Sequence, residues 1–489
     1  MLDIAQASVQ GGLPTPRDVA YYDVEWATGL SLEDVGLDVV AEDVEEEVDV
    51  LAMTWAAFEQ TFASAPGVRT TLPWRQEGIL CLPRGERRAD ISQGLSYNAH
   101  DAVGKNPELL RAWCIDVSRA FDLPVMIHGW ARDVLSKFSG TATYHQAQDE
   151  ILALYLNDPP ENRSEVVFDG AFLVNGMPLV KGDMVALTVL QRAVESAWGA
   201  TVDDIGALGI SKEGQSHWIL GAVDERVGVL SPGGVFLGSP GTLVERWQSD
   251  WGCALPDGRS DPLFDQAARL MDWIERSPAG QAVGHAFHPI NWTDQILARH
   301  LLITADLGIR GQHDWIWPLL GEEEFFDAIA HPSWRFTRVF DGSGVQLNDQ
   351  AGELGASLLP QVADALVRDR RTPEQPTVGV RETAGGFLVE AQTVFSSEST
   401  RREMVLVYGT SDESTFRAGT ARWSAQQMEA LPDGVFRAEL AGVPTSGEGL
   451  VVYVLAREAA QVRDLSFWRS ASSLPSELVK APRPAPCTF

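Results

Sequence analysis

Residues 205–230 read IGALGISKEGQSHWILGAVDERVGVL, and this stretch decides the fold. It opens with residues 205–210, a short apolar run that has the length and composition of a buried strand. Ser211-Lys212-Glu213-Gly214 follows at once, and residues 215–223 then have the character of a helix. Residues 226–230 are typical of the next strand. The pattern therefore predicts a strand, a sharp turn and a helix, with a serine in the turn.

A serine in such a turn is a candidate nucleophile. Catalysis by a serine hydroxyl requires an Oγ that is exposed near a base and near backbone N–H donors, and a tight turn between a buried strand and a helix provides that exposure. We therefore predict Ser211 as the nucleophile and the backbone N–H of Lys212 as an oxyanion donor. A second donor is expected from the turn around Asn98 to His100.

The spacing of the glycines around Ser211 departs from the usual pattern. In G-x-S-x-G the second glycine stands two residues after the serine, whereas this chain has G-x-S-x-x-G with Glu213 at that place. The alternative interpretation is an ordinary serine that caps a helix after a strand.

Strands and helices alternate on both sides of this segment. Further strands are predicted at 48–55, 77–83, 91–97, 123–127, 300–304 and 334–340. Further helices are predicted at 107–121, 143–157, 183–198 and 354–367. Repeated alternation predicts an α/β fold with a mostly parallel sheet and helices on both faces.

Composition divides the chain into four parts. Residues 1–45 form an acidic, irregular lead-in, and 46–370 form the α/β domain, in which 240–295 are Trp-rich and suggest a helical lid. A proline-containing linker at 369–376 follows. Beyond the linker, the expected module is a small β-sandwich at 377–460, because short strands alternate with turn residues, and 461–489 form a tail.

The segment around the serine resembles the PhoPQ-activated pathogenicity-related proteins. That family has a strand, a G-x-S-K-x-G turn, a Trp-bearing helix and a V-D-x-R-V step into the next strand. The matching residues here are Ser211-Lys212, Gly214, Trp218, Val223-Asp224 and Arg226-Val227. The resemblance is specific over residues 205–230 and looser over roughly 45–460. It implies an α/β-hydrolase domain followed by an immunoglobulin-like module, and it leaves the substrate undefined.

The resemblance also implies where the acid of a catalytic triad stands. The family carries an Asp followed by aromatic residues and proline after the strand that corresponds to 300–304. The run Asp314-Trp315-Ile316-Trp317-Pro318 fits this description, which makes Asp314 the candidate acid. Asp306 lies closer to the strand end and is the rival. Trp315 is a candidate substrate contact.

The base is missing from its expected place. A His is expected after the last strand at 334–340, but residues 341–346 contain none, and loss of a triad member typically costs several powers of ten in rate. Three explanations stay open: another His substitutes, the site carries out a different reaction, or the protein binds a ligand without catalysis. The histidines considered are His100 and His313, on the side of the sheet where the site is expected, and His128, His217 and His331.

Charge and cysteine usage restrict partners and location. The formal net charge of −30 argues against nucleic acid and anionic membranes, whose phosphates it repels. The first residues lack the pattern of a signal peptide, and no run approaches the roughly 18 apolar residues of a membrane span, so the cytoplasm is the predicted location. Cys81, Cys114, Cys253 and Cys487 are scattered and predict ordinary thiols rather than disulfides or a zinc site.

These observations favour an enzyme that acts through Ser211 on an ester, thioester or amide of a mostly apolar small molecule. The alternative is a non-hydrolytic enzyme, or an inactive protein that binds a small molecule, on the same scaffold. We expect no cofactor and no metal. The C-terminal module is a candidate surface for a homodimer.

Overall fold

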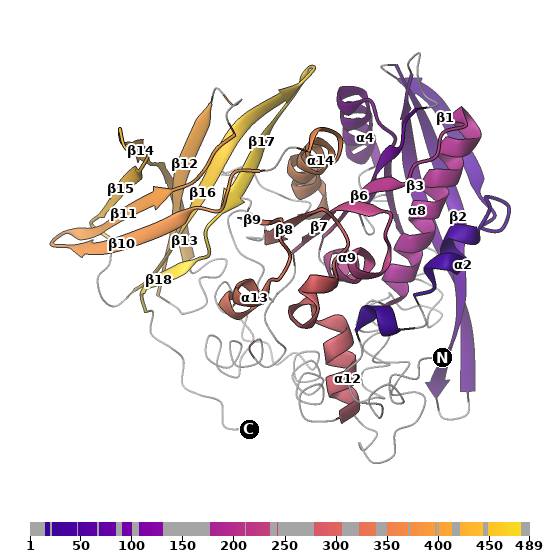
Figure 1. The fold of residues 1–489 in the computed structure, drawn as a ribbon, viewed down its shortest axis with the longest axis horizontal. Helices are drawn as coiled ribbons and strands as arrows, with labels where there is room; N and C mark the ends of the chain where they lie inside the picture. Colours follow the sequence, from indigo (N-terminus) through magenta and orange to yellow (C-terminus); the bar gives the residue numbers. More distant parts are fainter. Residues whose placement is uncertain are drawn as a thin grey trace.

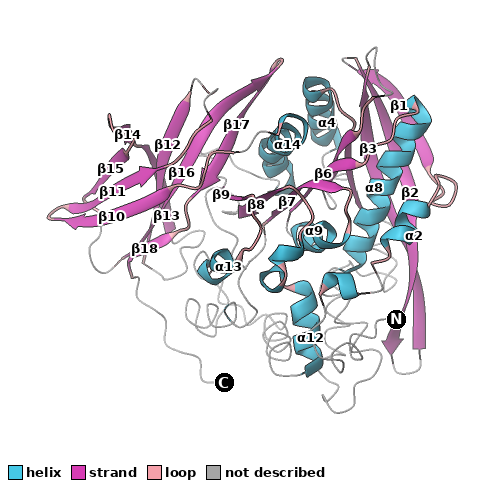
Figure 2. Cartoon of the chain, viewed as in Figure 1, coloured by secondary structure: helices cyan, strands magenta, loops and turns pink. Residues whose placement is uncertain are grey.

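The structure is a computed structural model of the 489-residue chain. It describes residues 15–19, 22–45, 47–65, 68–84, 90–99, 107–130, 177–210, 212–234, 242, 278–305, 322–338, 350–369, 372–396, 399, 401–412, 421–443 and 448–480. A large sheet lies between layers of helices, and smaller antiparallel sheets carry the C-terminal part of the chain (Figures 1 and 2).

The large sheet is mixed and mainly parallel. Its nine strands have the order β1-β2-β3-β5-β4-β6-β7-β8-β9. The antiparallel part consists of β1 (Asp38–Glu45), β2 (Val48–Ala65) and β3 (Val68–Pro83), and β3 also pairs antiparallel with β5 (Val125–Trp130). All later pairings are parallel, through β4 (Gln93–Asn98), β6 (Asp204–Ile210), β7 (Val227–Gly233), β8 (His300–Ala305) and β9 (Trp334–Arg338).

Helices cover both faces of this sheet, as the alternation predicts. α8 (Met177–Trp198) and α9 (Lys212–Val223) share one hydrophobic cluster with the sheet, and α4 (Pro107–Phe121) and α14 (Gln350–Arg368) share another. The shorter helices are α2 (Val24–Gly29), α12 (Pro278–Phe287), α13 (Glu323–Ala328), η1 (Pro16–Asp18), η3 (Pro289–Asn291) and η4 (Thr293–Gln295). Within the described ranges, no helix has the length and apolar character needed to cross a membrane.

α4 has the predicted bounds, and its residues explain why. Pro107 stands in the first turn, where a missing N–H costs nothing. Leu110, Cys114, Val117 and Phe121 are buried, and their spacing places them on one stripe of the helix. That stripe faces the sheet.

Cys81 of β3 and Cys114 of α4 form a disulfide, so the prediction of ordinary thiols is wrong for these two residues. They stand 33 residues apart in the chain, with a Cα–Cα distance of 5.9 Å, because α4 packs directly on β3. Spacing along a sequence does not report that contact. Disulfides persist mainly in oxidising compartments, so the cysteines no longer support the predicted cytoplasmic location.

After the linker, two antiparallel sheets share one hydrophobic core. One sheet contains β10 (Thr377–Thr383), β11 (Gly386–Gln392), β15 (Phe436–Ala441) and β14 (Glu429–Ala430). The other contains β13 (Ala421–Gln427), β12 (Arg402–Ser411), β16 (Gly449–Val462), β17 (Leu465–Ser472) and β18 (Ser476–Val479). Val389 of the first sheet and Leu406 and Val454 of the second lie in the same cluster. Two antiparallel sheets around a common core are what a β-sandwich requires.

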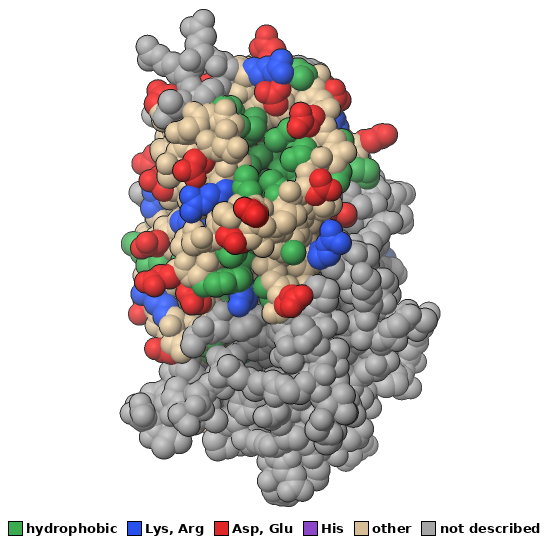
Figure 3. All heavy atoms as spheres, turned by 90° about the vertical axis from the view of Figure 1, so that its right-hand side faces the viewer, with side chains coloured by type: hydrophobic (Ala, Val, Ile, Leu, Met, Phe, Trp, Pro, Cys, Tyr) green, Lys and Arg blue, Asp and Glu red, His purple; other side chains and the backbone are tan. Residues whose placement is uncertain are grey.

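Regular structure extends into both ends of the chain, where a lead-in and a tail were expected. β1 lies within residues 1–45, and all eight of its residues are exposed, so it lacks the apolar alternation by which a strand is recognised. Charges on such an edge strand discourage pairing with other molecules. Figure 3 shows acidic side chains spread over the face on the side of β1 and β2.

At the C-terminal end of the chain, β17 and β18 lie within 461–489 and complete the second sheet by pairing with β16.

The α/β domain and the C-terminal module are joined by a buried junction. Arg469 of β17 donates to Asp364 of α14 at 2.6 Å and to Glu458 of β16 at 3.1 Å. Phe467 packs against Phe121 of α4, with ring centroids 6.0 Å apart. All five side chains are buried.

We expect Cys81 and Cys114 to resist alkylation in denatured protein until a reductant is added. Replacing both by alanine should lower the free energy of unfolding by about 3 kcal/mol, because the cross-link restricts the unfolded chain. Peptide mapping after iodoacetamide treatment and urea unfolding test the two statements. Alkylation of both cysteines without reductant would show that the bond is absent.

Candidate functional site

The carboxyl ends of the parallel strands meet at one edge of the large sheet. Asn98 of β4 lies opposite Gly209 of β6, and Gly233 of β7 lies opposite Thr304 of β8. The segments that carry the predicted site residues follow β4, β6 and β8. All of these segments therefore begin at the same edge of the sheet.

Position 211 lies between a strand and a helix. β6 ends at Ile210 and α9 begins at Lys212, so a single residue joins the two elements. The predicted site residues that lie outside the described part of the chain are Ser211, His100, His313, Asp314, its rival Asp306, and Trp315. Their side-chain roles stay predictions. Lys212 is the first residue of α9, so its backbone N–H belongs to the N-terminus of that helix.

Glycines bring α9 directly onto the sheet. A Cβ at Gly209 would lie 2.4 Å from His217 Nδ1 and 2.5 Å from the carbonyl oxygen of Glu213. A Cβ at Gly214 would lie 2.0 Å from the carbonyl oxygen of Gly233. These distances leave no room for any side chain. The helix meets the backbone of β7 at position 214, so the glycine is required there. Position 213 holds the completely buried Glu213, and this accounts for the spacing G-x-S-x-x-G.

A buried polar network lies behind the turn and consists of Asn98, Asp183, Glu213, Ser216 and His217. Asp183 of α8 accepts hydrogen bonds from Asn98 Nδ2 at 2.6 Å and from Ser216 Oγ at 2.8 Å. His217 Nδ1 lies 2.7 Å from the carbonyl oxygen of Glu213. Because a carbonyl oxygen only accepts, this nitrogen carries the proton. None of the five residues is more than 1% exposed. The network ties α8 and α9 to the end of β4.

Burial controls protonation in this network. Desolvation raises the pKa of Asp183 well above its usual value, although the hydrogen bonds from Ser216 and Asn98 act against it, and the charge of Glu213 raises it further. Desolvation lowers the pKa of His217 to about 4, opposed by the backbone carbonyl and the charge of Glu213. His217 is therefore a neutral imidazole at pH 7.

A second buried imidazole, that of His128, belongs to β5 and lies beside Asn98 at the end of β4. Its Nε2 is 3.1 Å from Ser96 Oγ, and its ring centroid is 6.2 Å from that of Trp55. Its Nδ1 has no hydrogen-bond partner among the described residues. Desolvation lowers the pKa of His128 to about 3, with a smaller contribution from His217. This ring is also neutral at pH 7.

Three of the histidines considered as a base are thus buried and already in contact with protein groups. Besides His128 and His217, the ring of His331 is buried and its Nε2 donates to the carbonyl oxygen of Ala298 at 2.7 Å. Asn98 is bound to Asp183, and its predicted part in an oxyanion site stays a prediction. Among the described residues, no three His, Cys, Asp or Glu side chains form a group that could hold a metal.

Sequence reasoning missed Asp183, which organises the network. Its signal was present, because Asp183 is the one charged residue between Lys181 and Arg192 in an otherwise apolar helix. A carboxylate at such a position requires hydrogen-bond partners when it is buried. The sequence does not reveal that Asn98, 85 residues away, is one of them.

A mainly parallel sheet with helices on both faces, and a serine position between a strand and a helix at its carboxyl edge, define the α/β-hydrolase class of fold. No family model and no curated protein matches the chain. Among solved structures, the chain is similar to an acetyl xylan esterase from Paenibacillus sp. R4, at 13% identity over 69% of this chain and 93% of that one, with a TM-score of 0.38. It is also similar to acetyl xylan esterase 1 from Thermoanaerobacterium sp. JW/SL YS485 (12% identity, 69% and 92% covered, TM-score 0.35). A third is a glucuronoyl esterase from Solibacter usitatus (12% identity, 68% and 86% covered, TM-score 0.35). At such low scores we assign the fold from its own sheet and turn.

We expect Gly214→Ala to lower the free energy of unfolding by at least about 2 kcal/mol, because the new methyl group meets the backbone of Gly233. Gly29→Ala is the matched control, since a Cβ there has nothing within 4 Å and the change should stay within about 0.5 kcal/mol. Urea unfolding measures both. Equal stability of the two variants would mean that α9 does not pack this closely.

His128 should make the protein less stable in mild acid. Its folded pKa of about 3 lies below the ordinary histidine value of 6.5, so its contribution to stability is present above pH 6.5 and is lost as the pH falls towards 3. The raised pKa of Asp183 has the opposite effect on stability, a loss as the pH rises above 3.8. Asp183 is present in both the variant and the unchanged protein, so this effect cancels in the comparison. His128→Gln should therefore reduce the slope of the unfolding free energy against pH in this window by up to about 1.4 kcal/mol per pH unit. Urea unfolding at several pH values measures the slope, and parallel curves would refute a neutral His128.

Proposed function

We propose that this protein is an ester hydrolase of the α/β-hydrolase class that uses Ser211 as its nucleophile. The observation that supports this most is the placement of position 211. β6 ends immediately before it and α9 begins immediately after it, and α9 packs back on the sheet so closely that a Cβ at Gly214 would lie 2.0 Å from the carbonyl oxygen of Gly233. This is the local geometry that presents a serine hydroxyl at the edge of a sheet.

The proposed reaction begins with attack of the Ser211 hydroxyl on the carbonyl carbon of an ester, thioester or amide. Negative charge then develops on the carbonyl oxygen. The N-terminus of α9 favours that charge, and the backbone N–H of Lys212 is the donor that we assign to it. The base takes the hydroxyl proton as the new bond forms and passes it to the leaving group, whose bond to the carbonyl carbon breaks, and water then hydrolyses the acyl-serine. We propose a mostly apolar acyl or leaving group, because Trp residues are frequent in 240–320.

The acid and the base are assigned to segments that leave the same edge of the sheet. Asp314, or Asp306 in its place, follows β8, and His100 follows β4, while His313 precedes Asp314 directly. The buried polar network supports this assignment. Asp183 binds both Asn98 at the end of β4 and Ser216 in α9, and so fixes these two elements relative to each other. Trp315 is the proposed substrate contact.

A second candidate function is binding, or non-hydrolytic chemistry, on the same scaffold. Residues 341–346 contain no His, and the rings of His128, His217 and His331 are buried in contacts of their own. A Ser211 without an imidazole base would position a ligand rather than attack it.

Finer assignments belong to the same proposal. We assign the C-terminal sheets to an immunoglobulin-like sandwich, supported by their shared core, and the chain to the PhoPQ-activated pathogenicity-related family, supported by residues 205–230. The homodimer through this module stays a proposal as well. The Cys81–Cys114 disulfide favours an oxidising compartment over the predicted cytoplasm.

Labelling with a fluorophosphonate that reacts with activated serines tests the nucleophile. We expect the full-length protein to be labelled and Ser211→Ala to be unlabelled, with hydrolysis of an activated ester reduced by about a thousandfold or more. Ser92→Ala, an exposed serine before β4, is the control and should behave like the unchanged protein. Labelling that persists in Ser211→Ala would exclude this residue. An unlabelled protein that hydrolyses no activated ester would favour the binding function.

A further inference from the structure

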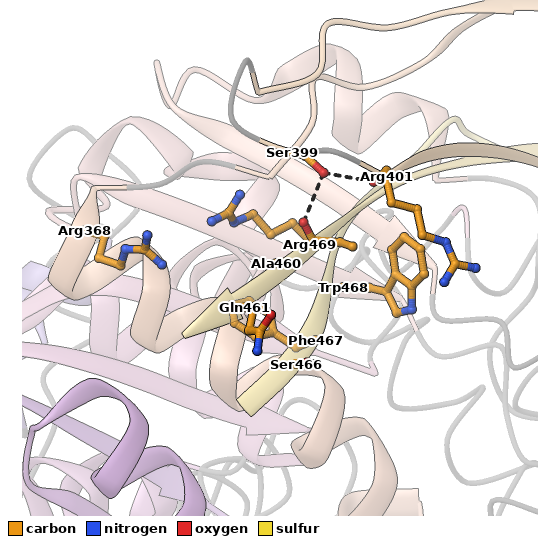
Figure 4. A pocket seen from close by; sticks show the side chains of 10 residues that line it. Arg368, Ser399, Arg401, Ala460, Gln461, Ser466, Phe467, Trp468 and Arg469 are labelled. Carbon is orange, nitrogen blue, oxygen red and sulfur yellow. Dashed lines mark hydrogen bonds between the residues drawn. The ribbon is translucent and has the colours of Figure 1, made fainter. Parts of the chain in front are cut away.

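A cavity of about 500 Å³ lies at the junction of the α/β domain and the C-terminal module. Its lining includes Arg368 at the end of α14, Ser399, Arg401, and Gln461, Trp468 and Arg469 of the β16–β17 hairpin. Figure 4 shows the side chains of Arg368 and Arg469 extending into the same region, with Arg401 beside Trp468. The volume is that of a small-molecule site.

The charge of this lining is unusual for the chain. Its described residues include three arginines and neither Asp nor Glu, although the protein carries a net charge of −30. The carboxylates that pair with the arginines lie behind them. Asp364, which is 0% exposed, accepts from Arg469 at 2.6 Å and from Arg368 at 3.2 Å. A ligand in the cavity would therefore meet guanidinium groups first.

Arg401 belongs to a similar arrangement. Glu403, which is buried, accepts from Arg401 on one oxygen and from Arg457 on the other, each at 2.8 Å. The two guanidinium carbons lie 4.9 and 4.7 Å from the ring centroid of Trp468. The side chain of Arg401 is 67% exposed, so its remaining N–H donors face solvent and the cavity.

Four guanidinium groups thus share three buried carboxylates, which leaves an excess of one positive charge. The carboxylates are Asp364, Glu403 and Glu458, and none is more than 5% exposed. A bound anion would neutralise this excess positive charge. Arginine is the side chain best suited to hold it, because its planar fork of N–H donors matches the oxygens of a carboxylate or a phosphate.

The cavity is distinct from the proposed reaction site. The carbonyl oxygen of Leu366, two residues before Arg368, accepts from Gln93 at the beginning of β4. Arg368 therefore lies at the amino edge of the parallel strands, whereas position 211 follows the carboxyl end of β6.

We propose that this cavity is a second ligand site, which binds the carboxylate or phosphate group of a small organic anion between the two modules. The arginines bind the oxyanion, and Trp468 and Phe467 contact the apolar part of the molecule. Because the lining comes from both α14 and the β16–β17 hairpin, a bound anion also strengthens the junction. The site is independent of catalysis at Ser211.

Calorimetric titration of the full-length protein at low ionic strength, with citrate in one arm and inorganic phosphate in the other, tests the proposal. We expect at least one of the two to bind, more weakly as salt is added. The double variant Arg368→Gln/Arg401→Gln should raise its Kd at least about tenfold, while fluorophosphonate labelling stays unchanged. Arg422→Gln is the matched control, since this side chain is 70% exposed and pairs with Glu448 at 2.7 Å, outside the cavity, and it should bind as the unchanged protein does.

Each outcome decides the matter. Binding of citrate alone identifies a carboxylate site, binding of phosphate alone a phosphate site, and binding of both a general oxyanion site. Gln461→Trp, at an exposed position, should block binding by filling the cavity, and it replaces the double variant if circular dichroism shows that variant to be unfolded. The proposal is overturned if neither anion binds, if the arginine and tryptophan variants bind as tightly as the unchanged protein, or if Arg422→Gln weakens binding equally.

Discussion

The close approach of α9 to β6 and β7 is the constraint on which the rest of the structure depends. Gly209, Gly214 and Gly221 provide it, since a Cβ at Gly221 would also lie only 2.4 Å from the Leu230 side chain. Because none of these three positions has room for a Cβ, α9 is held directly against β6 and β7 along its length. The same approach buries Glu213, Ser216 and His217. Buried polar groups need partners, and Asp183 of α8 binds Ser216 directly and lies 3.5 Å from His217.

The other end of α9 is held to α8 through Arg226, which forms a buried ion pair with Asp224 and also binds side chains of α8. Arg226 donates to Asp224 at 2.6 Å, to Thr188 at 2.8 Å and to Gln191 at 2.7 Å. A buried pair of this kind fixes an orientation more than it adds stability, because desolvation offsets much of the attraction. Residues 205–230, which carry the family resemblance, therefore include residues that hold each end of α9 in place.

The sequence predicted the elements whose apolar residues repeat at helix or strand spacing, such as α4 and β6, and both elements that flank position 211. Features that depend on distant partners could not be predicted. β2 was expected to end at Trp55 but continues to Ala65, because β3 pairs with it along its length. Neither the disulfide nor the bond between Asn98 and Asp183 leaves a local pattern. The candidate site was predictable only as far as the step from strand to helix at position 211, since the proposed acid and base belong to segments without a repeating apolar pattern.

The junction between the two modules changes what counts as a domain in this chain. Phe467 covers Phe121, and Arg469 supplies the counter-charge of Asp364, so β17 finishes the outer surface of α4 and α14. A module attached only by its linker could be exchanged or lost without harm. Here its removal would uncover apolar side chains such as Phe121 and would take from Asp364 the nearer of its two arginine partners. The linker is therefore a boundary in composition, but side-chain contacts join the two halves across it and couple their stability.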